Sequence, residues 1–225
     1  MIKLTNILRE ATQPLFEPVK LNWKYDEYEP AIDAETMKVH YTKHYIGYID
    51  KLNEAVKKEN IPVVFDEKMG GIQRILATVS QYSDVVRNNG GGFFNHTIWF
   101  DQLNPKAKGK IFGLAEVMIN DQYGSYDKFC KEFKDAGLAH FGSGWVWLMY
   151  DKSRLYITTT SNQDNPYMDT INQPGKILIG IDLWEHSYYL KYKNDREKYL
   201  DNVFKLLCYD MINDRLQRAI NSLTY

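Results

Sequence analysis

The sequence has few cysteines, no long apolar run and no excess of one charge. Each of these absences counts against one class of protein. Cys130 and Cys208 are the only two cysteines and neither belongs to a C-x-x-C pair, so we expect two free thiols in a reducing compartment. No apolar stretch approaches the roughly 20 residues of a membrane helix. The net charge is −1, without a long basic block. We therefore expect neither a membrane nor nucleic acid as a partner.

Residues 1–20 mix charged with apolar side chains, including Lys3, Arg9, Glu10 and Glu17. A secretory signal needs an uninterrupted apolar segment after its basic start, so these residues form a poor one. The acidic side chains also count against a short organellar presequence, which stays the alternative. We expect a cytoplasmic protein and treat residues 1–20 as an extension of unknown role.

With 225 residues, the chain can bury a sizeable core in one large or two small domains. Two helical segments dominate its first half. Asp33 is a good N-cap for a helix that runs to about Lys58, and a second helix is expected from near Gly71 through Arg87. Residues 103–105 then form the best domain boundary, because Pro105 cannot continue a helix.

After this boundary the sequence pattern combines helices with strands. Helices are expected near residues 109–120, 125–140, 196–206 and 209–223. Short apolar runs predict strands at 145–150, 155–160 and 176–183. The predicted fold class is α+β: an N-terminal long-helix hairpin domain, residues 21–105, is followed by an α/β domain, residues 106–225, with a small three-stranded antiparallel sheet.

Asp182 and His186 lie four residues apart where the last predicted strand meets a helix-like segment. A carboxylate at the end of a strand and an imidazole one turn later can converge on one point, and this pair of ligands suits zinc, iron or manganese. The alternative is structural: Asp182 caps the helix and His186 is an ordinary aromatic neighbour.

Further imidazoles lie in the helical half. His40, His44 and Tyr48 are spaced by four residues and share one helix face. His96 follows three consecutive glycines, which are costly in a helix and so require a reason such as a close backbone approach. A packed aromatic face is the alternative for His40 and His44. Together with Asp182 and His186, His40 and His96 make a plausible four-ligand metal site at the domain junction.

These residues belong to a series of motifs that resembles the iron/manganese superoxide dismutases from about Leu21 onward. The motifs are Tyr25-Asp26, Glu29-Pro30, Thr36-Met37-Lys38-Val39-His40, Thr42-Lys43-His44, Tyr48, Arg87-Asn88-Asn89, Asn95-His96, Phe141-Gly142-Ser143-Gly144-Trp145-Val146-Trp147-Leu148, Asn162-Gln163-Asp164 and Asp182-x-Trp184-Glu185-His186-x-Tyr188-Tyr189-Leu190-Lys191. They occur in the family's order, which makes the resemblance specific.

The resemblance implies a role for each matching position. It implies one manganese or iron ion per subunit, bound by His40, His96, Asp182 and His186. The other implied roles are Gln163 as the partner of solvent at the metal, Tyr48 and His44 as the gate of the substrate funnel, Trp145, Trp147 and Trp184 as pocket walls, Glu185 and Tyr189 as dimer-interface residues, and Lys43 and Arg196 as positive charges near the funnel.

The resemblance also bears on the choice of metal. In iron-type members the glutamine comes from the position of Gly92, whereas in manganese-type members it comes from the position of Gln163. This chain has Gly92 and Gln163 and so resembles the manganese type. It departs from the family at Trp99-Phe100, where the second position is commonly Trp, and at Tyr41, where His is frequent.

The implied activity is superoxide dismutation, the conversion of two superoxide anions into O2 and hydrogen peroxide, by a homodimer or tetramer. Two alternatives come from other classes. Two histidines and a carboxylate also suffice for a non-haem iron oxygenase or a hydrolase. A non-catalytic scaffold could keep the same fold, and loss of a ligand or of Gln163 would be its sign.

Overall fold

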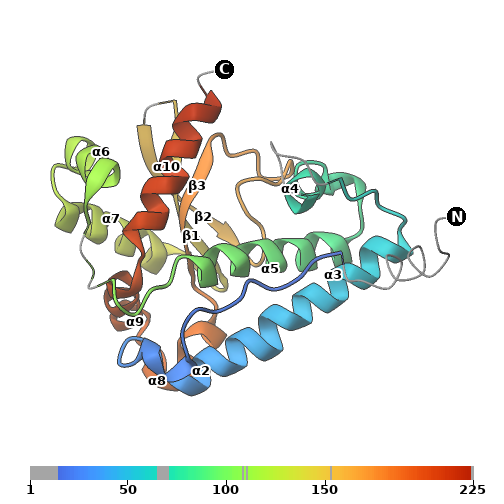
Figure 1. Ribbon diagram of the computed structural model, residues 1–225, viewed down its shortest axis with the longest axis horizontal. Coiled ribbons are helices and arrows are strands. Elements are labelled where there is room, and N and C mark those ends of the chain that lie inside the picture. Colours follow the sequence, from blue (N-terminus) through green and yellow to red (C-terminus); the bar gives the residue numbers. More distant parts are fainter. Residues whose placement is uncertain (1–14, 65–70, 108, 110, 153, 224–225) are drawn as a thin grey trace, which may run out of the picture.

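The structure is a computed structural model that describes residues 15–64, 71–107, 109, 111–152 and 154–223. Two long helical stretches run side by side, and a three-stranded sheet packs against one of them with further helices around it (Figure 1). Among these residues, no helix is both long enough and apolar enough to cross a membrane. The predicted α+β class, with a helical hairpin first and an antiparallel sheet second, is confirmed.

The first long stretch joins helix α2 (Ala34–Val39), a π-helical segment (His40–Tyr45) and helix α3 (Ile46–Lys58) without a break. Asp33 caps it as predicted, because its carboxylate accepts a backbone N–H of the first turn at 2.8 Å. A π-helical turn is wider than an α-helical one and is frequent at functional sites. Here it begins at the first candidate metal ligand.

The second long stretch is helix α5 (Asp84–Asp101), and it does not begin where the sequence predicted. The expected helix from Gly71 through Arg87 is wrong, because α4 (Gly71–Leu76) ends early and a new helix starts at residue 84. The side chain of Ser83 accepts a backbone N–H of the first turn at 3.3 Å and caps the new helix. The Ser-Asp pair at 83–84 is the start signal that sequence reasoning missed.

The three glycines lie inside α5, and two of them allow a close approach, as expected. A Cβ at Gly91 would overlap the carbonyl oxygen of Gln163, and a Cβ at Gly92 would lie 2.5 Å from the ring of Tyr48. At Gly90 an added methyl group would make only ordinary van der Waals contacts. Glycine makes α5 intrinsically less stable at these two positions, but it leaves the space that the Gln163 carbonyl and the Tyr48 ring occupy.

The sheet has the order β2-β1-β3 with both pairings antiparallel. Its strands are β1 (Gly144–Asp151), β2 (Arg154–Ser161) and β3 (Lys176–Asp182), close to the predicted ranges. The helices of this half are α6 (Gly113–Tyr123), α7 (Tyr126–Ala139), α8 (Tyr189–Tyr192), α9 (Arg196–Val203) and α10 (Tyr209–Leu223). Because α10 and α5 both contact β3, while α6 and α7 contact β2, the central strand is buried along its whole length.

Residues 1–14 of the predicted extension lie outside the described residues, whereas residues 15–20 pack along the long helix. Phe16 is buried, and its backbone exchanges two hydrogen bonds of 2.9 Å with the side-chain amide of Asn53. The backbone of Val19 bonds to the hydroxyls of Tyr41 and Tyr45. The predicted division at residues 20 and 105 stays a prediction.

A pair of glycine-to-alanine substitutions tests the close approach. Gly47→Ala, on α3 with nothing within 4 Å of the added Cβ, should stabilise the protein by about 0.5–1 kcal/mol, since alanine is the better helix former. Gly91→Ala should destabilise it by about 1–3 kcal/mol through overpacking against Gln163. Urea denaturation of both variants gives the free energies of unfolding, and equal stabilisation by both would contradict the packing described here.

Candidate metal centre

Four side chains from four separate segments converge on one point. His40 begins the π-helical segment, His96 lies in α5, Asp182 ends β3, and His186 lies in the short 3-10 turn (Glu185–Ser187) that follows. One potential ligand atom from each lies within 4.8 Å of all the others. The long helix, the glycine-containing helix and the sheet thus meet where the sequence predicted a metal.

Asp182 is at the centre of the cluster. Its Oδ2 lies 3.1 Å from Nε2 of His40, 3.7 Å from Nε2 of His96 and 3.2 Å from Nε2 of His186. Its Oδ1 accepts the backbone N–H of Trp184 at 2.8 Å. One oxygen of Asp182 therefore fixes the turn and the other faces the imidazoles, and its role as a metal ligand stays a prediction.

Burial sets the protonation states of the cluster. It lowers the pKa of His40 to about 4 and that of His96 well below its ordinary value, because a charged imidazole is costly away from water. Burial alone raises the pKa of Asp182, but the neighbouring His186 and His40 outweigh it and hold that pKa below its usual range. At neutral pH, His40 and His96 are neutral and Asp182 is ionised, which are the forms that bind metal ions.

The donor set fits one metal ion. Nε2 of His40 and Nε2 of His96 are buried and, although Asp182 Oδ2 lies 3.1 and 3.7 Å away, neither makes a well-directed hydrogen bond among the described residues. Buried polar atoms are rarely left without a partner, and an ion at the convergence point would supply one. On the far side of its ring, Nδ1 of His96 lies 2.7 Å from the carbonyl oxygen of Gly92, which directs Nε2 inward. Three imidazoles and one carboxylate suit manganese, iron or zinc.

Aromatic rings enclose the cluster. Trp145 meets His96 edge-on with ring centroids 5.3 Å apart, and Trp184 stacks on His186 at 5.5 Å. Trp147 lies one layer back, stacked on Trp145 at 5.4 Å. These are the three tryptophans named as walls from the sequence.

The departure at Trp99-Phe100 is accommodated inside this shell. The ring of Phe100 lies 5.1 Å from that of His40, so a phenyl ring forms this part of the wall without an indole N–H. Trp99 is fully buried, and its Nε1 has no hydrogen-bond partner among the described residues. We find no physical account of that orphaned donor.

Gln163 connects the outer residues to one another. Its Nε2 donates to the hydroxyl of Tyr48 at 3.1 Å, and its Oε1 accepts from Nε1 of Trp145 at 3.1 Å and from Nδ2 of Asn95 at 3.2 Å. The ring of Tyr48 in turn lies 5.1 Å from that of His96. Asn95 was noted only as part of a motif, and the sequence offered no signal that it binds Gln163.

Gly92 lies against the ring of Tyr48. Since a Cβ at Gly92 would lie 2.5 Å from that ring, any side chain at position 92 would require the Tyr48 ring to move. His44, the other gate residue predicted from the sequence, stacks on His186 with centroids 4.1 Å apart.

The remaining predicted residues lie farther out. Glu185 and Tyr189 are exposed on the surface beside the cluster. Arg196 donates to the carbonyl oxygens of His140 and Gly142 at 2.9 and 3.0 Å, so it holds the loop after α7. Among the described residues, Lys43 makes no ion pair and is exposed, which leaves its charge available to a passing anion.

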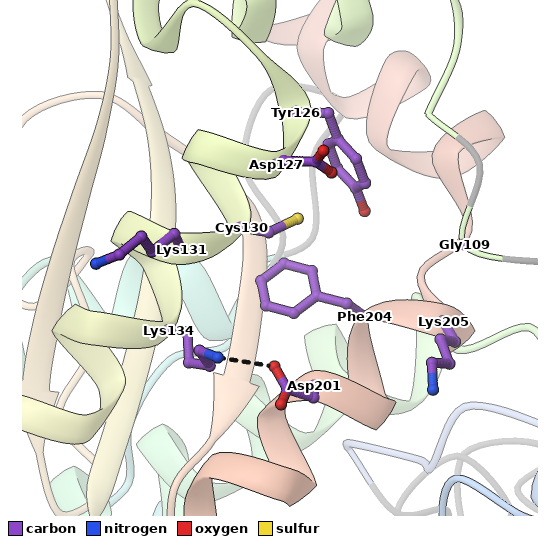
Figure 2. A pocket seen from close by; sticks show the side chains of 9 residues that line it. All are labelled: Gly109, Tyr126, Asp127, Cys130, Lys131, Lys134, Asp201, Phe204 and Lys205. Atoms are coloured by element: carbon purple, nitrogen blue, oxygen red, sulfur yellow. Dashed lines mark hydrogen bonds and ion pairs between the residues drawn. The ribbon is translucent and has the colours of Figure 1, made fainter.

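A pocket of about 310 Å³ between α7 and α9 has different chemistry (Figure 2). Its Lys134 already contacts Glu197 and Asp201. Burial raises the pKa of the Cys130 thiol to about 11, so this thiol is protonated and a poor nucleophile at neutral pH. None of the lining residues belongs to the metal cluster.

Comparison with known proteins agrees with this geometry. Residues 15–104 match the alpha-hairpin domain of iron/manganese superoxide dismutases, and residues 113–215 match their C-terminal domain. The chain belongs to this family. It is 39% identical over 206 residues to a manganese superoxide dismutase of Listeria innocua, covering 91% of this chain and 98% of the relative.

Two further relatives come from other bacterial groups. Identity is 38% over 207 residues with a manganese superoxide dismutase of Acinetobacter baylyi, covering 91% of this chain and 89% of the relative. It is 37% over 217 residues with a manganese superoxide dismutase of Leptolyngbya boryana, covering 93% and 85%. The matches therefore extend over both halves of the chain, and each half contributes two residues to the cluster.

Metal addition tests the cluster directly. Mn²⁺ at about 100 times its dissociation constant should stabilise the metal-free protein by about 2.7 kcal/mol, because only the folded chain assembles the site. His96→Ala should lose most of this increment, whereas His140→Ala, whose ring lies 3.3 Å from the carbonyl of Ser143, should keep it. Thermal unfolding with and without Mn²⁺ measures the increments, and an equal increment in both variants would rule the cluster out.

Proposed function

We propose that His40, His96, Asp182 and His186 bind one manganese or iron ion, and that Gln163, Tyr48 and His44 serve the superoxide dismutase reaction of this family at that ion. The observation that carries the proposal is the convergence of four ligand atoms within 4.8 Å, three of them on buried residues and the fourth on the partly buried His186. The reaction converts two superoxide anions and two protons into O2 and hydrogen peroxide.

An ion held by His40, His96, Asp182 and His186 would supply one-electron redox chemistry, accepting an electron from one superoxide anion and returning it to a second. The side chains control charge around it. Asp182 contributes one negative charge and the neutral imidazoles of His40 and His96 contribute none, which limits the net charge that a dry pocket has to hold. The aromatic walls exclude bulk water and keep the ligands in one arrangement.

Gln163 and Tyr48 handle protons in this proposal. Burial, with a contribution from the charge of Asp182, raises the pKa of Tyr48 to about 12. The phenol therefore stays protonated at neutral pH and can donate toward the cluster. Gln163 uses its Nε2 on Tyr48 and its Oε1 on Trp145 and Asn95, which holds the carboxamide in one orientation.

The enclosure favours a diatomic substrate over an organic one. His40, His96 and Asp182 are each at most 1% exposed, and aromatic rings lie within about 5 Å of the ligand imidazoles. An oxygenase or hydrolase would need room for a larger substrate beside the ligands. A scaffold would not need Gln163 or the complete ligand set, and both are present.

Manganese is the proposed metal. Two observations support this proposal: the chain has Gln163 together with a glycine at position 92, and the relatives are named manganese superoxide dismutases. The hydrogen bonding of the groups around a metal shifts its reduction potential, so the origin of the glutamine affects which metal is active. The cytoplasmic location stays a prediction.

A homodimer is proposed from the surface beside the site, with the tetramer as the larger alternative. Phe141 is 99% exposed, and Tyr189 and Leu190 are 47% and 46% exposed. Arg196 connects these segments through Gly142 and the hydroxyl of Tyr188. Apolar side chains gathered in this way indicate an interface. Glu185 is exposed beside His186, so it could reach the cluster of a second copy.

Metal content measured together with dismutase activity tests the function. The metal-free protein reconstituted with Mn²⁺ should bind about one ion per chain and regain activity, because the cluster offers one four-ligand site. Gln163→Ala should bind the metal but lose about 10–100-fold in turnover, the usual effect of removing such a partner. Gln217→Ala, at an exposed position on α10, is the matched control.

The possible outcomes distinguish the enzyme function, the metal preference and the role of Gln163. Activity with iron as well as manganese would keep the enzyme and discard the metal preference. A manganese-loaded parent without activity would overturn the proposal, and full turnover in Gln163→Ala would remove this residue from the reaction.

Sedimentation velocity tests the dimer. Phe141→Glu should convert the protein to monomers, because a buried unpaired charge at an interface is costly. Val117→Glu, which replaces another exposed apolar residue on α6, should leave the dimer intact. A monomeric parent, or a dimer that tolerates Phe141→Glu, would contradict the proposed interface.

A further inference from the structure

One face of α5 holds the turn that carries Gln163. Arg87, Gly91 and Asn95 are spaced by four residues and lie along the same face of the helix. Each contacts the turn after β2. Arg87 binds the carboxylate of Asp164, Gly91 leaves room for the carbonyl of Gln163, and Asn95 donates to that carbonyl at 3.0 Å.

The contact between Arg87 and Asp164 is bidentate. Nε lies 2.8 Å from Oδ1 and Nη2 lies 2.7 Å from Oδ2. The two side chains are 33% and 16% exposed, so water screens the pair only in part. Two parallel charge-assisted hydrogen bonds fix direction as well as distance, unlike a single surface contact, which contributes little. Arg87 thus constrains the residue directly after Gln163.

The residue directly before Gln163 is also held. The backbone N–H of Asn162 donates to the carbonyl of Ser143 at 2.9 Å, and its own carbonyl accepts from Nε1 of Trp184 at 3.0 Å. Its φ of 53° lies in the left-handed region, which asparagine tolerates better than most residues. Both sequence neighbours of Gln163 are therefore held in place. Asn162 is held by residues of the C-terminal half, whereas Asp164 is held by Arg87 of the helical half.

We propose that Arg87 is a positioning residue, which through its ion pair with Asp164 sets the distance of the Gln163 carboxamide from the metal ligands and thereby the reduction potential of the centre. The inference rests on the proposed function of Gln163. Arg87 itself touches neither substrate nor metal ligand. Its effect passes through the turn, because moving the amide changes the hydrogen bonding around the metal.

The metal-free protein tests the positioning alone. The indole N–H of Trp145 donates to Oε1 of Gln163, so its NMR resonance reports the place of the amide. Both Arg87→Gln and Gln163→Ala should move this resonance. Arg218→Gln is the matched control, since it removes a guanidinium from an exposed pair with Asp214, and it should leave the resonance in place.

The manganese-loaded protein tests the consequence. Arg87→Gln should shift the reduction midpoint and lower kcat about tenfold, the lower end of the range for groups around a metal site, with KM and metal content unchanged. Arg87→Lys keeps the charge and should recover part of the loss. Asp164→Asn should reproduce the displaced Trp145 resonance if Arg87→Gln does not fold.

A folded Arg87→Gln or Asp164→Asn protein with the parent's Trp145 resonance and midpoint would overturn the inference. That failure is distinct from failure of the proposed function. An inactive parent overturns the function whatever the resonance does, whereas an active parent whose Trp145 ignores both substitutions overturns only the role of Arg87.

Discussion

The structure depends on one buried carboxylate held among three imidazoles. Asp182 is fully buried, and an isolated charge in such a place is very costly. Its neighbours offset this cost: one oxygen accepts a backbone N–H and the other faces His40, His96 and His186. Since these groups come from both halves of the chain, the carboxylate has its compensating neighbours only when the helices and the sheet are packed together.

Glycine allows this packing to be close. Gly91 and Gly92 lie in the middle of α5, where their lack of a side chain admits the turn of Gln163 on one side and the ring of Tyr48 on the other. The intrinsic helix penalty of two glycines is about 2 kcal/mol. The approach in return places an amide and a phenol beside the metal cluster. Of these two glycines, Gly91 thus lies at a contact between the two halves and Gly92 at a contact within the helical half.

Control of the site is therefore distributed in layers. Asp182 supplies a buried charge, aromatic rings surround the imidazoles, and Gln163 links Tyr48 to Trp145 and Asn95. Outside these layers, the ion pair of Arg87 with Asp164 ties the turn to α5. Each layer restricts the conformations of the one inside it, which is how a preorganised site avoids reorganisation during reaction.

The fold class, the three strands and the candidate ligand set could all be predicted from the sequence. Periodicity and capping residues are local, and the order of motifs carried the family resemblance without any coordinates. The prediction of one helix from Gly71 to Arg87 was wrong, because the helical pattern continues across the break between α4 and α5. Only the capping residue Ser83 marks that break in the sequence.

Which side chains contact one another became known only from the packed structure. The contact of Asn95 with Gln163, the overlap that forbids a side chain at Gly91, and the use of Arg196 to hold a loop all join residues distant in sequence. Such contacts depend on the relative placement of helix and sheet to within about an ångström. No local pattern of residues encodes that placement, because it results from how the whole core packs.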